Sequence, residues 1–172
     1  MELTWYGRTC IRLRGKDAVV VNDPYPSIVG PTGRGITGDV VTFSHPDDAP
    51  LKKAKGKPSR DGKTLLPTSL ESAFSLDGPG EYEVKEVLLT GVRTYRDDAR
   101  GGDRGKQVSF VIEVDGVHTI HLGDIGHLLS EENTRLALIQ PEATERLRNA
   151  HLHWGTTVLA GLVRTAWHTP PR

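Results

Sequence analysis

Short apolar or alternating runs, each closed by Gly, Pro, Asn or Asp, dominate residues 1–122 of this 172-residue chain. Runs of this length are typical of successive β-strands rather than helices. We therefore expect strands at residues 3–6, 10–14, 18–21, 40–43, 81–95 and 107–122. The first two are expected to pair as a hairpin, and Asp115-Gly116 predicts a tight hairpin turn inside the last stretch.

Helical character is predicted only after residue 130. Ser130 and the acidic residues that follow resemble an N-cap and first turn, which would open a helix to about Ile139, and Pro141 would open another through Asn149. Residues 25–38 are rich in Pro and Gly and predict a long loop on the surface or over a site. Strands first and helices after predict a single layered α/β or α+β domain.

The charge balance and cysteine content limit the classes of partner and compartment. With 22 basic and 22 acidic residues, no overall field draws the chain to nucleic acid or to an anionic membrane. The basic run at residues 52–57 lacks aromatic residues and is interpreted as a solvated loop. Cys10 is the single cysteine, and neither a secretion signal nor a membrane-spanning apolar run is present. We expect a cytoplasmic protein with a small-molecule substrate or anion as partner.

Three predicted strand ends carry residues suited to chemistry. His45 and Asp47 follow the strand at 40–43 and could converge on a metal ion, although the same segment also makes an ordinary turn. Asp124 follows the last strand and could be a metal ligand or a base, or could simply close a Gly-rich turn. Asp97, after the strand that ends at residue 95, is interpreted with its neighbour Asp98 as a solvated loop acid.

Five segments in order resemble the landmarks of the metallo-β-lactamase-fold hydrolases, and most closely their lactonase-like branch. They are WYGRTC at 5–10, VVNDP at 20–24, VTFSH at 41–45, DGPGEYEV at 77–84 and HLGDIGH at 121–127. The match runs from Met1 to about Leu138. The resemblance implies a four-layer αββα sandwich with a zinc or manganese site, where a metal-bound hydroxide attacks an ester, lactone, amide or phosphoester.

The resemblance transfers only part of the ligand set to this chain. His45 falls on the first histidine of the family's His-x-His-x-Asp-His loop, and Asp124 falls on the aspartate that usually bridges two metals. Asp47 stands in place of the second histidine, Ala49 in place of the aspartate and Pro50 in place of the last histidine. The second metal's ligands in this loop are therefore absent.

Two arginines stand where related sequences carry histidines. Arg8 follows the glycine of the first landmark, and Arg96 follows Thr94-Tyr95. A guanidinium stays protonated in proteins and has no lone pair to give a metal, so these replacements oppose metal binding.

The resemblance ends before the C-terminus. We therefore predict a truncated metallo-β-lactamase-like domain over residues 1–138 and an unmatched, mainly helical tail over 139–172, so that the αββα sandwich is incomplete at its C-terminal end. The tail's histidines, His151, His153 and His168, match no part of the ligand pattern.

Two functions from different classes compete. The first is a hydrolase with a reduced zinc or manganese site of His45, Asp47 and Asp124, in which the two aspartates are the catalytic residues. Asp23, His121 and His127 would support these ligands from behind. The second is a non-catalytic anion binder in which Arg8 and Arg96 grip a phosphate or carboxylate. A third possibility is a remnant too short to fold stably. The substrate cannot be read from the sequence.

Overall fold

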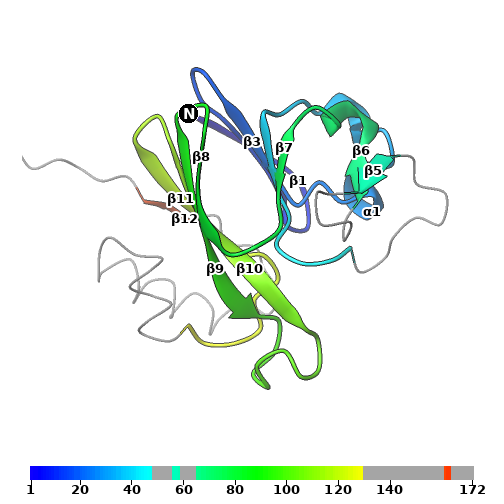
Figure 1. The fold of residues 1–172 in the computed structure, drawn as a ribbon, viewed down its shortest axis with the longest axis vertical. Coiled ribbons are helices and arrows are strands. Elements are labelled where there is room, and N and C mark those ends of the chain that lie inside the picture. The colour runs from blue at the N-terminus through cyan, green and yellow to red at the C-terminus, as the bar shows by residue number, and fades with distance from the viewer. Residues whose placement is uncertain (48–55, 59–64, 130–160, 164–172) are drawn as a thin grey trace, which may run out of the picture.

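Two facing sheets of five strands each form the framework of the protein (Figure 1). The structure, a computed structural model, describes residues 1–47, 56–58, 65–129 and 161–163. The first sheet has the order β1-β2-β3-β4-β7. Its strands are β1 (Glu2–Gly7), β2 (Cys10–Arg14), β3 (Val19–Asn22), β4 (Val40–Thr42) and β7 (Phe74–Leu76).

The second sheet has the order β12-β11-β10-β9-β8 and is antiparallel throughout. Its strands are β8 (Gly80–Val84), β9 (Val87–Tyr95), β10 (Lys106–Val114), β11 (Val117–His121) and β12 (Gly161–Val163). The long strands β9 and β10 extend past the rest of the sandwich (Figure 1). The small elements are α1 (Pro26–Val29), the 3-10 turns η1 (Gly33–Gly35) and η2 (Thr68–Leu70), and the two-stranded sheet of β5 (Gly56–Pro58) and β6 (Leu65–Pro67).

The parallel part of the first sheet decides where a site can form. β3, β4 and β7 run parallel to one another, so their carboxyl ends lie at the same edge. The residues that follow β3 and β4 therefore emerge side by side, and these are Asp23 and Ser44-His45. The amide of Val108 in β10 donates to Ser44 O at 2.8 Å, which joins this edge to the second sheet.

Apolar packing on both faces of the first sheet holds the layers together. Between the two sheets, Phe110 is fully buried among side chains of β2, β3, β4, β9 and β10. On the opposite face, Tyr25 and Val29 pack with residues of η2 and β6 against the sheet. Burial of a large apolar side chain stabilises the fold by about 1.5 to 3 kcal/mol, so these two clusters fix the spacing of the layers.

Most of the predicted strands are confirmed. The first two pair antiparallel as expected, with Leu3 opposite Leu13. The hairpin at Asp115-Gly116 is also confirmed, and both residues have positive φ, 53° and 70°, as a type I′ turn requires. The layered α/β architecture expected from the order of elements is present.

Two predictions needed correction. The stretch at 81–95 is two strands, because a turn at Lys85-Glu86 adopts positive φ at both residues without a glycine or asparagine to signal it. The segment at 25–38 is not a plain loop, since it contains α1 and η1 and buries Tyr25, Val29 and Ile36 against the first sheet.

Several expectations lie wholly or partly outside the described residues. The helices predicted at 130–139 and 141–149 do, and so does most of the basic run at 52–57, of which the last two residues begin β5. In the predicted tail, residues 161–163 form β12 and pair with β11. Among the described helices, none combines the length and apolar character needed to span a membrane.

Candidate functional site

The segments that carry His45 and Asp124 touch each other directly. Gly123 lies against Ser44 so closely that a Cβ on the glycine would come within 2.6 Å of both Ser44 Cβ and Oγ. Gly123 also has φ +65°, so glycine is needed here for conformation as well as for space. The two predicted strand tips therefore meet at one place between the sheets.

A buried carboxylate fixes the first of these tips. Asp23 is fully buried with φ 49°, and its carboxylate accepts the Ser44 N–H at 2.6 Å and the Ser44 hydroxyl at 2.6 Å. The Tyr25 hydroxyl accepts the His45 N–H at 3.0 Å. Its single proton is shared between Asp23 Oδ1 at 3.0 Å and His45 O at 2.5 Å. Asp23 and Tyr25 thus set the backbone that presents His45.

Burial leaves the groups around Asp23 protonated. It raises the pKa of the Cys10 thiol to about 12, with the negative charge of Asp23 adding to the effect. Burial, again assisted by Asp23, also raises the pKa of Tyr25 well above its ordinary value. Both groups are therefore uncharged near neutral pH, and Tyr25 acts as a hydrogen-bonding strut rather than as a base.

One ring nitrogen of His45 is engaged in a hydrogen bond to the backbone. Its Nδ1 lies 2.7 Å from Pro46 O, and a carbonyl oxygen only accepts, so Nδ1 carries the proton. The ring stacks on Tyr25 with centroids 5.1 Å apart. When the ring is neutral, its lone pair is on Nε2, which is the atom that could bind a ligand.

Asp47 is directed toward α1. Its carboxylate accepts the Ser27 N–H at 3.2 Å and also the Ser27 hydroxyl. This contact ties the residues after β4 to the first helix.

Asp124 is held by two guanidinium groups. Its Oδ2 accepts Arg96 Nε–H at 3.1 Å, Arg96 Nη2–H at 2.8 Å and Arg104 Nη2–H at 2.8 Å. The side chains of Asp124 and Arg96 are 12% and 8% exposed, whereas that of Arg104 is 50% exposed. The backbone N–H of Asp124 donates to Gln107 Oε1 at 3.0 Å. One aspartate oxygen therefore accepts three N–H groups from two permanent cations.

The loop between β9 and β10 is built to hold Arg104. Asp97 accepts the backbone N–H groups of Gly101 at 2.6 Å, Arg104 at 2.6 Å and Asp103 at 3.2 Å. These bonds, first that from Arg104, lower the pKa of Asp97 below its ordinary value. Asp97 is 7% exposed, so its interpretation as a solvated loop acid is corrected, while its neighbour Asp98 is exposed.

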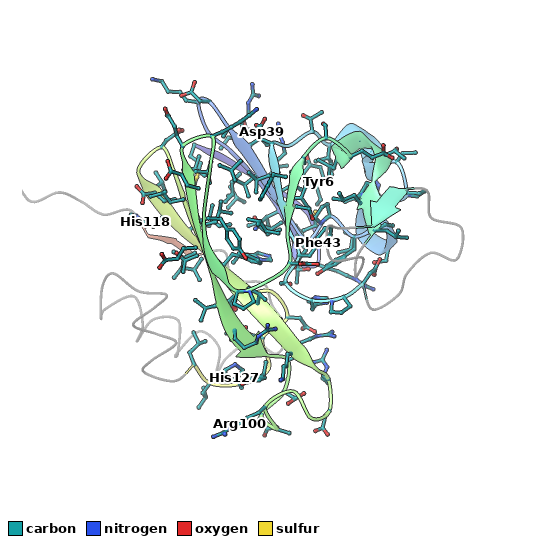
Figure 2. All side chains as sticks on the ribbon, in the orientation of Figure 1. Tyr6, Asp39, Phe43, Arg100, His118 and His127 are labelled. Atoms are coloured by element: carbon teal, nitrogen blue, oxygen red, sulfur yellow. The ribbon has the colours of Figure 1, made fainter. Side chains whose placement is uncertain are left out.

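The other residues predicted for the site are His121, Arg8 and His127, and each of them lies in a different environment. His121 is fully buried, donates from Nε2 to Thr9 O at 2.8 Å, and stands 3.7 Å from Asp23 Oδ2. Arg8 is exposed on the turn between β1 and β2. His127 contacts Tyr95 edge-on, and Figure 2 shows it near Arg100 at the end of the sandwich opposite Asp39.

These donors do not fit a metal ion. Within the described residues, no group of three or more His, Cys, Asp or Glu side chains is placed to hold one, so His45, Asp47 and Asp124 are not gathered into such a group. The carboxylate oxygen of Asp124 that faces Arg96 is already charge-compensated. A cation approaching that oxygen would meet two guanidiniums.

Arg104 and Gln107 are the contributors that sequence reasoning missed. Arg104 lies in a loop rich in Asp, Arg and Gly, and its alternating charges were a signal that the loop could pair with residues at the strand ends. Gln107 is fully enclosed beside Thr94 and Leu122, whose carbonyl accepts its side-chain N–H at 2.7 Å. Nothing in the sequence marks this glutamine as different from a surface one.

Two facing sheets, with a polar centre where the strand ends meet, define an α/β sandwich protein whose site lies at the edge of the sheets. The chain belongs to the β-lactamase superfamily, since the sequence model of the Beta-lactamase superfamily domain matches residues 2–141. The resemblance to the superfamily and the metallo-β-lactamase type of fold predicted from the sequence are confirmed. Membership of the lactonase-like branch stays a prediction.

A solved structure of a related protein agrees with this assignment. A Thermotoga maritima protein, provisionally named a Zn-dependent hydrolase of the metallo-beta-lactamase superfamily, is 27% identical with a TM-score of 0.54, covering 86% of this chain and 70% of its own. A Parabacteroides distasonis ATCC 8503 protein, provisionally named a metal-dependent hydrolase, is 15% identical with a TM-score of 0.47, covering 72% and 60%. The search of curated proteins found no match.

Proposed function

We propose that this chain is an anion-binding member of the superfamily that does not hydrolyse through a metal-bound water at Asp124. The observation that carries the proposal is the contact of Arg96 and Arg104 with Asp124 Oδ2. The two guanidiniums carry one positive charge more than Asp124 alone neutralises. Oxyanions such as phosphate or a carboxylate are the ligands that guanidinium groups bind best.

Arg104 is the group that would grip the ligand. It is half exposed, and one of its five N–H groups donates to Asp124, which leaves its outer edge facing solvent. Arg96 is buried beneath it and bonds both Asp124 and the Arg104 carbonyl, the latter at 3.3 Å. The site therefore differs from the pair predicted from the sequence, because Arg104 rather than Arg8 stands beside Arg96. A role for the exposed Arg8 stays a prediction.

Thermal melting in phosphate tests the proposal. At constant ionic strength, a ligand at about ten times its dissociation constant stabilises the folded state by about 1.4 kcal/mol, which raises the melting temperature by a few degrees. Arg104→Gln should lose most of this rise. Arg100→Gln is the matched control, since Arg100 is an exposed arginine of the same loop, whereas the arginines that bond Asp124 among the described residues are Arg96 and Arg104. An equal rise in both variants, or no rise in the unaltered protein, contradicts anion binding at this cluster.

A metal-dependent hydrolase is the second candidate. The similarity to a protein named as a Zn-dependent hydrolase favours it, and so does the lone pair on His45 Nε2. The substrate would be an ester, a phosphoester or, as in the lactonase-like branch, a lactone, with His45, Asp47 and Asp124 as zinc or manganese ligands. Metal analysis of protein purified without a histidine tag separates the candidates. About one equivalent of metal, lost in His45→Ala, supports the hydrolase and opposes our proposal.

A further inference from the structure

The contact between Asp124 and its two arginines joins three segments of the chain that are otherwise separate. Arg96 follows β9, Arg104 lies in the loop before β10, and Asp124 follows β11. The backbone reinforces the junction, because Arg96 N–H donates to Gly105 O at 3.1 Å and Gly126 N–H donates to Tyr95 O at 3.0 Å. A cross-link of several loops through one shared charge is the structural task that a metal ion performs in a metalloprotein.

The charges oppose a metal ion at Asp124 Oδ2, the oxygen that makes this cross-link. A divalent cation needs a lone pair of the carboxylate, and Oδ2 already accepts three N–H groups from guanidiniums that stay protonated at all ordinary pH. To bind this oxygen, the ion would have to displace them. Displacement would break the bonds between Asp124 and the guanidinium of Arg96, which is 8% exposed.

The position of Arg104 is also specified independently of Asp124. Asp97 holds the Arg104 backbone N–H at 2.6 Å and closes the loop around Gly101, whose φ is +83°. A Cβ on Gly101 would come within 2.9 Å of the Gly105 carbonyl carbon, so the loop is closely packed at its neck. The loop thus fixes the backbone position from which the half-exposed Arg104 side chain reaches Asp124.

We propose that Arg96 and Arg104 supply at Asp124 the positive charge that a metal ion would supply in a metal-dependent relative, and that guanidiniums and divalent cations compete for this one carboxylate. The two guanidiniums therefore oppose a metal ion at Asp124 Oδ2, and the affinity of this carboxylate for a divalent cation rises when they are removed. This inference stands independently of anion binding, because it concerns the contact of the two arginines with Asp124 Oδ2 and not the exposed part of Arg104.

Manganese binding measures the competition without any activity assay. Free Mn²⁺ is titrated against the full chain by electron paramagnetic resonance, and thermal melting is recorded with and without Mn²⁺. We expect the double variant Arg96→Met with Arg104→Met to bind Mn²⁺ at least about tenfold more tightly than the unaltered protein, because two repelling charges are gone. Adding Asp124→Asn to that variant should abolish the gain and leave any binding elsewhere unchanged.

Two results would overturn the inference. One is stoichiometric Mn²⁺ binding by the unaltered protein that Asp124→Asn removes, and the other is a folded double variant that binds no more tightly than the unaltered protein. If the double variant does not fold, Arg104→Gln alone is used, since it removes the half-exposed cation and leaves buried Arg96 in place. It should gain Mn²⁺ affinity through Asp124, and absence of a gain counts against the proposal equally. Failure of the phosphate experiment leaves these outcomes unaffected.

Discussion

Individual residues hold the strand ends in place through buried hydrogen bonds that a carboxylate accepts. Asp23 is the clearest case, because it is fully buried, has φ 49° and receives the Ser44 N–H, the Ser44 hydroxyl and a contact from Tyr25. Aspartate and asparagine tolerate positive φ better than most residues, since their short side chains bond locally. Asp23 therefore serves both the chain reversal after β3 and the presentation of His45.

Replacing Asp23 tests this double role. Asp23→Ala should lower the free energy of unfolding by about 3 to 5 kcal/mol, because it strains the backbone and leaves the buried Ser44 N–H and hydroxyl unsatisfied. Asp23→Asn should cost roughly half as much, since its amide oxygen accepts the Ser44 N–H while its NH₂ donates to the hydroxyl. Urea unfolding measures both. Asp17→Ala, at an exposed aspartate, is the control and should change stability by less than about 0.5 kcal/mol. Equal losses of stability in the Asp23 and Asp17 variants would contradict the structural role of Asp23.

The sequence predicted which segments lie together better than it predicted which side chains pair. His45 and Asp124 were identified because each follows a strand, and the segments that carry them do meet at Ser44 and Gly123. The partner of Asp124 could not be read, because which guanidinium reaches it depends on the path of the loop after β9. That path is set by Asp97 bonding three backbone N–H groups, a contact with no signature in residue spacing.

At the scale of elements, the site depends on how closely the segment after β11 lies on the end of β9. Gly126 is the point of closest approach, since a Cβ there would fall 2.0 Å from Arg96 O and 2.8 Å from Asp97 N. Both are backbone atoms, so a side chain rotation cannot relieve the clash. The contact places Asp124 over Arg96, and it explains why two loops of different strands form one cluster.

Gly126→Ala should therefore separate the two segments. We expect a loss of about 2 to 3 kcal/mol in the free energy of unfolding, typical of overpacking against a part that cannot yield. The phosphate-induced rise in melting temperature should fall with it. Gly78→Ala is the control, because Gly78 also lacks positive φ and the new Cβ would meet Tyr82 Oη at 3.7 Å, an ordinary van der Waals contact. Similar stabilities of the two variants would show that this contact is not what positions Asp124.

Strands and turns were predictable where the local sequence carries a signal for them. They were not predictable where tertiary contacts alone determine the structure. The dipeptide Asp115-Gly116 predicts its hairpin turn. Lys85-Glu86 makes an equivalent turn with two residues that ordinarily avoid positive φ. The short strands β6 and β7 were also missed. β7 has three residues and exists because it extends the parallel part of the first sheet beside β4.

On the scale of the whole molecule, the two sheets form one sandwich because a common core lies between them. Phe110 and Ile112 of β10 pack with Leu13, Val20 and other residues of the first sheet. The sequence predicted this sandwich through the order of its landmarks, and the family match over residues 2–141 confirms it. The division into a domain at 1–138 and a tail at 139–172 remains a proposal, and β12 bears on it, because residues 161–163 complete the edge of the second sheet.

Removing residues 161–172 tests how far the sandwich depends on that edge. Pairing with β12 covers the outer side of β11, with Thr119 opposite Leu162. Without it, the backbone N–H groups on that side of β11 lose their partners and face solvent, as at any open sheet edge. Hydrogen exchange should therefore accelerate in the peptide that spans residues 117–121. Exchange in β2 and β3 of the other sheet should stay unchanged, because those strands keep their partners. Unchanged protection of β11 would mean that the second sheet ends at β11 in solution, in agreement with the predicted domain boundary at residue 138.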